Sequence, residues 1–397
     1  MQNQSRKRKK VKKKPLRRLD FPLLFVSLFL FIIGIIMIFS ASNVTAYMKQ
    51  GDSPYKYFIK QVIVLLLGAG GFTVLINTST KKYKKIFSFL FLVLTIFLGA
   101  LLIYGKATNG ATSWYNIFGF GFQPSEFIKV VSIGYLASYY DLKKDKLNNY
   151  VTALYPIFLC AVVAGLIFLQ PDLGTFLIYV SIVGLIFLAV PVDKDIKKKV
   201  LIIGVGVLTI GILFFATAGK SIINETQMAR ITEFRNPCSK FITTGNQVCN
   251  GYIAINNGGL LGVGLGNSMQ KYLYLPEPYT DFIFAIVMEE LGLIASIIII
   301  LCYMMTLYRI IMIGRKSHTN KGAIICYGVA IYIFVHILVN LGGLFGLIPL
   351  TGVPLPFLSY GGSYTLSLIG SLILVQRVHV ENVIYEEEQK EQEMYNF

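Results

Sequence analysis

Ten apolar runs follow one another along this chain, and most are long enough to cross, as helices, the roughly 30 Å of hydrocarbon in a bilayer. Inside hydrocarbon a backbone must satisfy its own hydrogen bonds, and an open segment does this only as a helix. The sequence therefore predicts an all-α, polytopic membrane protein, a bundle of about ten transmembrane helices. The expected spans are residues 21–42, 57–76, 86–104, 124–140, 151–169, 175–190, 201–218, 282–307, 323–341 and 364–376, of which the fourth, sixth and tenth are short.

The charge of the chain supports a membrane protein and argues against one that binds nucleic acid. Only 14% of the 397 residues are charged, where a soluble protein of this length carries about 25%. The formal net charge of +17 is concentrated in the first twenty residues, which hold ten of the 37 lysines and arginines, and in short segments between apolar runs. This distribution is the orientation signal of a membrane protein, so we expect no nucleic-acid partner.

The positive charges also predict the topology. When the basic N-terminus is placed in the cytoplasm, 27 of the 37 lysines and arginines fall on the cytoplasmic side, as the positive-inside rule requires. Both termini are then cytoplasmic, and the expected organisation is a basic tail (1–20), a membrane domain (21–380) and an acidic tail (381–397).

The long external segments are candidates for the functional site, because loops on a rigid bundle often carry function. The three long external segments are 105–123, 342–363 and the longest, 219–280, which joins helices seven and eight.

Ionisable side chains in or at the mouth of a span are expensive and therefore mark functional candidates. Glu126 and Lys129 in QPSEFIK share one helix face, and they either orient their helix as an ion pair or belong to a site. Asp172 and Asp281 begin the sixth and eighth spans, where an acid is either a helix N-cap or a functional group. The cap is favoured for Asp172 and the functional role for Asp281. All four lie near the outer boundary, which predicts a site that faces outward.

Other unusual residues are assigned to structure. Glu289 and Glu290, two turns into the eighth span, are expected to hold helices together, and His336 to be a hydrogen-bonded packing residue. The glycine-rich stretch 258–268 is external and follows no βα unit. Tight turns near the membrane surface therefore explain it better than a nucleotide-binding phosphate loop, although its N–H groups could still meet a lipid pyrophosphate.

The long external loop carries two further features. Cys238 and Cys249 lie in a compartment that permits a disulfide, but their spacing alone does not establish one. An anionic substrate at this face would need cations. Candidate cations are Arg230, Arg235, Lys240 and Lys271 in this loop, together with Lys129 at the mouth of the fourth span.

Several long strings occur together and in order: FSAS, NGATSWYNIFGFGFQPSEFIK, FLQPDLGT, GGLLGVGLGNSMQKYLYLPEPYTDFIFAIVMEELG and TGVPLPFLSYGGS. Through them nearly the whole chain resembles the SEDS family (shape, elongation, division and sporulation), which includes FtsW and RodA. The resemblance implies a peptidoglycan glycosyltransferase that polymerises lipid II, a disaccharide-pentapeptide on undecaprenyl pyrophosphate, into β-1,4-linked glycan strands. The site would face outward from the cytoplasmic membrane of a bacterium. The PLPFLSYGGS and PEPYTDFIF strings look closer to FtsW than to RodA, which favours septal synthesis over elongation.

The resemblance also implies roles for residues. The family's essential loop aspartate falls on Asp281, which would act as the catalytic base. Nearby cations, or a divalent metal (Mg²⁺ or Mn²⁺) held by Asp281, would stabilise the departing pyrophosphate; no organic cofactor is implied. Thr112 and Ser113 stand where many members carry one or two arginines, so one cation of the family pattern is missing from that loop. The expected substrate-binding residues are Lys129, Glu126, Trp114, Arg230, Arg235, Lys271, Gln123 and Ser359.

The implied partners are lipid II, a cognate class B penicillin-binding protein that crosslinks the glycan, and other divisome proteins. Two other functions stay open. A lipid II flippase would need a continuous polar route with access from both sides, for which Glu289, Glu290 and His336 are the best residues. The crowding of polar residues at one face favours the enzyme. The third function is a scaffold that only positions partners at the division site.

Overall fold

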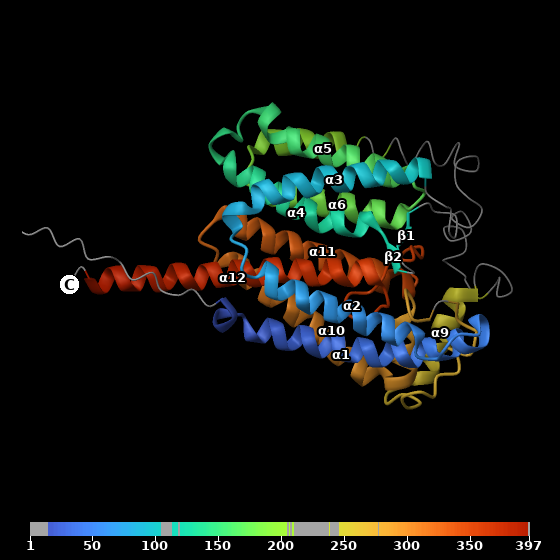
Figure 1. Cartoon of the computed structure of the whole chain (residues 1–397). Coiled ribbons are helices and arrows are strands. Elements are labelled where there is room, and N and C mark those ends of the chain that lie inside the picture. Colours follow the sequence, from blue (N-terminus) through green and yellow to red (C-terminus); the bar gives the residue numbers. More distant parts are fainter. Residues whose placement is uncertain are drawn as a thin grey trace, which may run out of the picture.

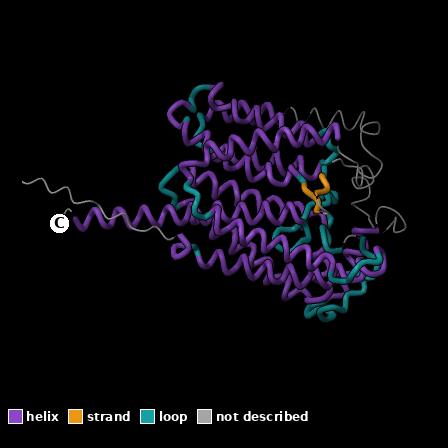
Figure 2. The backbone as a smooth tube through the Cα atoms, viewed as in Figure 1, coloured by secondary structure: helices purple, strands orange, loops and turns teal. Residues whose placement is uncertain are grey.

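The computed structural model describes residues 15–104, 113–117, 120–204, 206, 209, 238, 246–276 and 278–395. Its helices run side by side as one bundle (Figures 1 and 2). Among the helices described, six are long and apolar enough to cross a membrane, which confirms a polytopic helical bundle. The helices are α1 (Phe21–Val44), α2 (Lys56–Leu75), α3 (Tyr83–Tyr104), α4 (Pro124–Leu142), α5 (Tyr150–Phe168), α6 (Leu173–Ala189), α9 (Asn246–Gly258), α10 (Ile283–Arg315), α11 (Asn320–Leu344) and α12 (Gly362–Tyr395), with single turns at Pro15–Arg18, Thr45–Lys49, Thr80–Lys82 and Lys144–Lys146.

Nine of the ten predicted spans correspond to helices in the described part of the chain. The seventh, 201–218, lies largely outside it; its first residues, to Gly204, are helical. Two helices run further than expected, since α10 has 33 residues and α12 has 34. The acidic tail predicted from residue 381 continues α12 as helix to Tyr395, because its Glu, Gln and Lys residues are good helix formers.

The described parts of the three external segments meet at one end of the bundle. Strands β1 (Tyr115–Ile117) and β2 (Phe120–Phe122) pair antiparallel and lie with α9 at this end, while α12 projects beyond the opposite end (Figure 1). The sequence analysis predicts neither element, because the strands have three residues each and α9 is rich in asparagine. A disulfide joins Cys238 to Cys249 in α9, with the Cα atoms 5.0 Å apart, and decides that open question.

Polar caps fix where several helices begin. Asp20 accepts a hydrogen bond from the backbone N–H of Leu23 at 2.9 Å in the first turn of α1, and its carboxylate also pairs with Arg309 of α10. Asn149 caps α5 and Thr319 caps α11 in the same way. Each cap satisfies an N–H group that the start of a helix leaves without a partner in the helix.

Helix α10 is interrupted at Gly292, whose φ of 79° and ψ of 180° are not helical. The stretch that we call the glycine segment (residues 258–268) packs against this interruption, and Leu293 N donates to Gly259 O at 3.0 Å. A Cβ on Gly292 would lie 2.3 Å from the backbone nitrogen of Gly262, so only glycine fits. The glycines therefore allow the glycine segment to hydrogen-bond to the backbone of α10, in addition to forming the expected turns.

Replacing Gly292 by alanine is expected to destabilise the protein by about 2 kcal/mol or more, because left-handed backbone alone costs a residue with a Cβ roughly 1–2 kcal/mol. Thermal unfolding of the detergent-solubilised protein measures this as a lower Tm. Gly184→Ala on α6 is the matched control, since its Cβ would meet nothing within 4 Å. Equal melting temperatures for the two variants would contradict this account of the interruption.

Candidate active site

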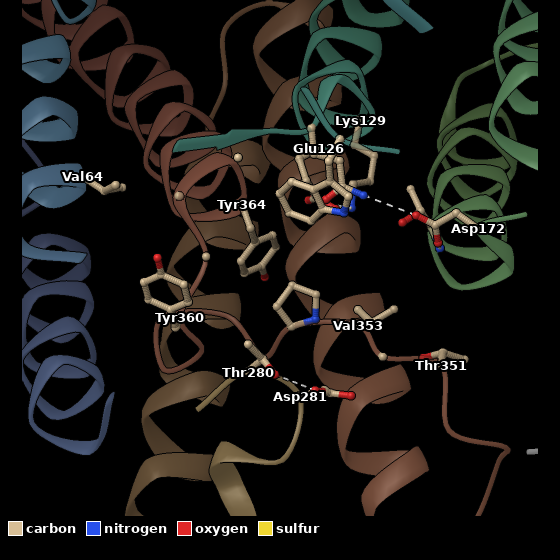
Figure 3. Close-up of a pocket in the computed structure, with 18 of the residues that line it drawn as sticks. Val64, Glu126, Lys129, Asp172, Thr280, Asp281, Thr351, Val353, Tyr360 and Tyr364 are labelled. Carbon is tan, nitrogen blue, oxygen red and sulfur yellow. Dashed lines mark hydrogen bonds and ion pairs between the residues drawn. The ribbon is translucent and has the colours of Figure 1, made fainter. Parts of the chain in front are cut away.

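A pocket of about 340 Å³ opens at the end of the bundle that carries the β-hairpin. Its walls come from α2, the hairpin, α4, the start of α6, the residues before α10 and the segment between α11 and α12 (Figure 3). Segments distant in sequence thus converge on one concave site, as in small-molecule binding sites generally. The charged side chains that line it are Lys60, Glu126, Lys129, Asp172 and Asp281.

Glu126 and Lys129 form the ion pair that their spacing allows. Lys129 Nζ lies 2.8 Å from each carboxylate oxygen of Glu126, and both side chains are buried. The amine also lies 3.1 Å from Nε2 of His336 on α11, whose Nδ1 lies 3.3 Å from the carbonyl oxygen of Pro354. Because a lysine ammonium only donates, Nε2 accepts and the Nδ1 proton points to Pro354. The pair therefore joins α4 to α11 and also faces the pocket, and His336 is the hydrogen-bonded packing residue expected.

Asp281 lies at the other end of the pocket from this ion pair (Figure 3). Its carboxylate accepts a hydrogen bond from Thr280 Oγ1 at 2.7 Å, and its backbone carbonyl accepts one from the amide of Asn340 at 2.8 Å. Helix α10 has Phe282 as its N-cap residue, with no side-chain cap bond. Asp281 is therefore not the cap of this helix, and α11 fixes its backbone at the pocket wall.

Asp172, Gln123 and Trp114 form a third wall. Asp172 caps α6 by accepting from Thr175 N at 3.0 Å, as favoured from the sequence, and it also accepts from Gln123 Nε2 at 3.3 Å. Trp114 is 41% exposed, and its indole ring lies so close to Gly121 that a Cβ there would be 2.9 Å from the ring. An exposed, positioned indole at a pocket is suited to stacking on a ligand ring.

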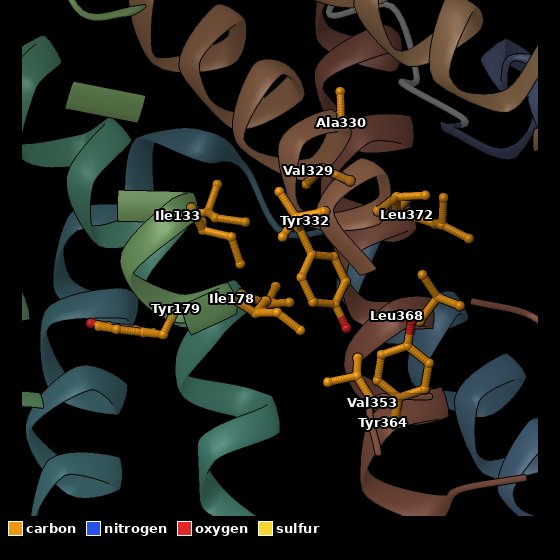
Figure 4. Close-up of a cluster of buried hydrophobic side chains, with 14 of the residues drawn as sticks. Ile133, Ile178, Tyr179, Val329, Ala330, Tyr332, Val353, Tyr364, Leu368 and Leu372 are labelled. Atoms are coloured by element: carbon orange, nitrogen blue, oxygen red, sulfur yellow. The ribbon is translucent and has the colours of Figure 1, made fainter. Parts of the chain in front are cut away.

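The floor of the pocket merges with the apolar core. Val353 and Tyr364 line the pocket and also belong to the buried cluster that includes Tyr332 (Figure 4). Beside them, burial and to a smaller extent Tyr57 raise the pKa of Tyr360 to about 12, so its hydroxyl stays neutral at physiological pH. Apolar walls of this kind lower the local dielectric constant and strengthen electrostatic interactions in the pocket.

Two predicted substrate-binding residues lie outside the pocket. The amine of Lys271 is buried against Glu290 at 3.0 Å, because the external loop folds back onto α10, and this corrects its assignment to the substrate. Ser359 lies behind the wall, where it donates to the carbonyl of Thr280 and accepts from Leu355 N at 2.8 Å. It therefore holds the wall instead of facing a ligand. Arg230 and Arg235 lie outside the described residues.

Several pocket residues have no counterpart among the predicted ones, including Lys60 and residues 351–354. Lys60 lines it from the second turn of α2, and the signal that identifies it is a lysine inside an apolar run. Residues 351–354 line it between α11 and α12. They belong to the TGVPLPFLSYGGS string, from which only Ser359 is selected by sequence.

The bundle of candidate membrane-spanning helices, with a charged pocket at one end, identifies the chain as a multi-pass membrane protein. Residues 21–384 match the model of the FtsW/RodA/SpoVE family, described as cell cycle protein. This chain belongs to that bacterial family, and the resemblance noted in the sequence is confirmed.

The curated relatives extend over almost the whole chain. A "Probable peptidoglycan glycosyltransferase FtsW" of Bacillus subtilis (strain 168) is 34% identical over 385 residues, 96% of this chain and 95% of the relative. The "Stage V sporulation protein E" of the same organism is 35% identical over 90% of this chain and 97% of its own length.

Two solved structures share the fold. One, from "Structural coordination of polymerization and crosslinking by a peptidoglycan synthase complex", has a TM-score of 0.71 and 22% identity, and the match covers 92% of this chain and 98% of the other. The Thermus thermophilus rod shape determining protein RodA has a TM-score of 0.65 and 22% identity, with coverage of 92% and 97%.

Proposed function

We propose that this protein is a peptidoglycan glycosyltransferase that polymerises lipid II into β-1,4-linked glycan strands for septal wall synthesis. The observation that carries the proposal is the convergence of Asp281 and the Lys129–Glu126 pair on one pocket between helices. Relatives that are 34% identical over nearly their whole length are named peptidoglycan glycosyltransferase FtsW, which supports the division role. An enzyme of cell elongation, of the RodA type, is the alternative.

The proposed setting is the cytoplasmic membrane of a bacterium, with both termini in the cytoplasm. The positive-inside rule supports this orientation, and the pocket then faces outward with the loop-rich end of the bundle. An outward pocket between helices would admit the sugar head group of a lipid-linked substrate while its polyprenyl chain stays in the bilayer.

Chain extension with inversion joins the 4-hydroxyl oxygen of the acceptor sugar to the anomeric carbon of the donor. The hydroxyl proton passes to the carboxylate of Asp281, and the bond from the anomeric carbon to the pyrophosphate oxygen breaks, its electron pair leaving with the lipid pyrophosphate. A positioned base of this kind contributes about 10²–10⁴-fold to the rate. Trp114 and Gln123, on a wall of the same pocket, are suited to stack on a sugar ring and to hydrogen-bond it.

The departing pyrophosphate needs positive charge. Lys129 is fully buried and bonded to Glu126 and His336, so it supplies a fixed charge from within the wall. Lys60 of α2 is half-buried, less than Lys129, and lines the same pocket. It is suited to contact the phosphates directly, in place of the arginine that many members carry where Thr112 and Ser113 stand here.

Lys60→Ala is therefore expected to lower kcat/KM for lipid II about 10–100-fold, the loss of one hydrogen bond to a charged group (about 1.5–3 kcal/mol). Lys60→Arg keeps the charge and should retain most of the activity. Lys56→Ala is the matched control, because Lys56 lies one turn earlier on α2 and pairs with Asp52 outside the pocket. Initial rates over a range of lipid II concentrations measure the effect, and equal rates for the two alanine variants would remove Lys60 from the proposal.

A divalent metal is a second source of positive charge. Within the described residues no three His, Cys, Asp or Glu side chains gather to hold a metal ion, so the protein offers no complete cage there. Asp281 could hold Mg²⁺ or Mn²⁺ jointly with phosphate oxygens of the substrate, the usual mode for Mg²⁺. We expect EDTA to lower polymerisation and Mg²⁺ to restore it; activity that is indifferent to EDTA would exclude this role.

Purified full-length protein given lipid II in detergent tests the proposed function. Glycan polymer on a gel supports the enzyme. No polymer, but transfer of lipid II across vesicles, would support the flippase instead, and neither activity would leave the scaffold. Three contacts argue against a polar path: Glu289 bonds to Ser268, Glu290 to Lys271 and His336 to Lys129.

A polymerase alone makes glycan that is not crosslinked. We therefore propose a cognate class B penicillin-binding protein as partner, together with other divisome proteins. The fold shared with a chain of a peptidoglycan synthase complex is consistent with such an assembly. Co-purification of the full-length protein with its cognate transpeptidase checks this proposal.

A further inference from the structure

The glycine segment and the six residues that follow it expose an unusual set of side chains. Eight large apolar or aromatic side chains between residues 260 and 274 are 41–79% exposed. A loop surrounded by water normally exposes charged residues and keeps apolar patches small. The eight are Leu260, Leu261, Val263, Leu265, Met269, Tyr272, Leu273 and Tyr274.

The charged groups at this loop face the protein interior. Lys271 is 1% exposed and its amine binds Glu290 at 3.0 Å and the carbonyl of Gly266 at 2.6 Å. Glu289 is fully buried and accepts hydrogen bonds from Ser268 and, at 3.2 Å, from the backbone N–H of Met269. The loop therefore has its one charged side chain inside and its apolar side chains outside, the reverse of a water-soluble loop.

Backbone hydrogen bonds fix the level of this loop along α10. Val263 N donates to Glu289 O at 2.9 Å, and Ile294 N donates to Leu260 O at 3.2 Å. Gly292, at the interruption, is nine residues beyond the first residue of α10, which corresponds to about 13 Å along a helix. The glycine segment thus reaches well past the start of α10, and α10 satisfies backbone groups that hydrocarbon could not.

The surface of α10 at this level is apolar and exposed, as expected of a surface that faces lipid. Leu293, Ile294, Ile297 and Ile298 are 39–50% exposed on a helix long and apolar enough to cross a membrane. Because Ile294 is bonded to Leu260 through the backbone, the exposed apolar side chains of the loop lie next to those of α10.

We propose that residues 259–265 form a re-entrant wedge embedded in the bilayer leaflet on the pocket side, with Leu260, Leu261 and Leu265 among the acyl chains. The wedge determines how deep in the bilayer the connection between α9 and α10 lies. Asp281 is at the end of this connection, next to α10. This inference does not depend on the proposed enzymatic activity. A second protein that covers the same surface is the competing occupant.

Spin labelling of the full-length protein in phospholipid nanodiscs tests the wedge. Single cysteines are placed at Leu261→Cys and, as a second site, Leu265→Cys, in a Cys302→Ala background that removes the half-buried thiol. Ile298→Cys serves as the lipid-facing control, and Lys390→Cys, an exposed position in the charged C-terminal part of α12, as the water-facing control. Collisions with oxygen, which concentrates in lipid, and with a water-soluble nickel complex are compared.

The wedge predicts an oxygen-to-nickel collision ratio at both loop sites close to that at Ile298 and severalfold above that at Lys390. A ratio like that at Lys390 would place the loop in water and overturn the proposal. Labels shielded from both reagents would show a protein cover, such as a second copy, and would overturn it as well. Neither reading requires lipid II, so failure here is separate from failure of the glycosyltransferase assay.

Discussion

Asp281→Asn is expected to lower the rate of glycan polymerisation about 10²–10⁴-fold, the contribution of a general base. Asparagine has nearly the same shape as aspartate, and the contacts that place this residue involve its backbone carbonyl and the neighbouring Thr280. The fold should therefore survive while the proton acceptor is lost. Polymer formed from labelled lipid II by the purified protein measures the rate, and an unchanged Tm confirms the fold.

Asp172→Asn is the matched control for this experiment. Asp172 is a second carboxylate in the same pocket, but it caps α6, and asparagine is as good a cap as aspartate. We expect this variant to lose less than tenfold in rate. If Asp281→Asn polymerised at full speed, or if both variants lost the same large factor, the assignment of the base to Asp281 would be wrong.

The spans and the charged part of the site could be predicted because hydrocarbon tolerates few charges. Each charge within an apolar run is conspicuous, and Glu126, Lys129, Asp172 and Asp281 all line the observed pocket. The spacing of Glu126 and Lys129 also allows their ion pair, because residues three apart share a helix face. These properties are local in sequence.

The parts that could not be predicted depend on contacts between distant segments. Lys271 is one of few external cations, yet its amine binds Glu290, 19 residues away, once the loop folds back. The stretch MEELG continues a helical pattern, and the interruption at Gly292 arises because the glycine segment bonds to α10 there. Neither contact leaves a periodic pattern of residues in the sequence from which it could be predicted. Lys60 differs, because a lysine inside an apolar run is visible from the sequence alone.

The buried ion pair of the site leads to the second large prediction, which concerns stability as well as activity. Lys129→Met leaves the carboxylate of Glu126 buried without its counter-ion, and breaking a buried pair in this way costs about 3–5 kcal/mol. We expect a much lower Tm and no measurable polymerisation. Cys160 and Cys326 are buried free thiols, so a thiol-reactive fluorophore reports unfolding directly in detergent.

The double variant Lys129→Met with Glu126→Gln separates the two roles of the pair. Removing both charges takes away the uncompensated carboxylate, so most of the lost stability should return, because neutral replacements of a buried pair are often tolerated. Activity should not return, since the pocket has then lost the fixed cation near the leaving phosphate. A double variant no more stable than Lys129→Met would show that the two charges are not coupled. Full activity in the stable double variant would mean that the pair only joins α4 to α11, and the positive charge for the reaction would have to come from Lys60 or a metal ion.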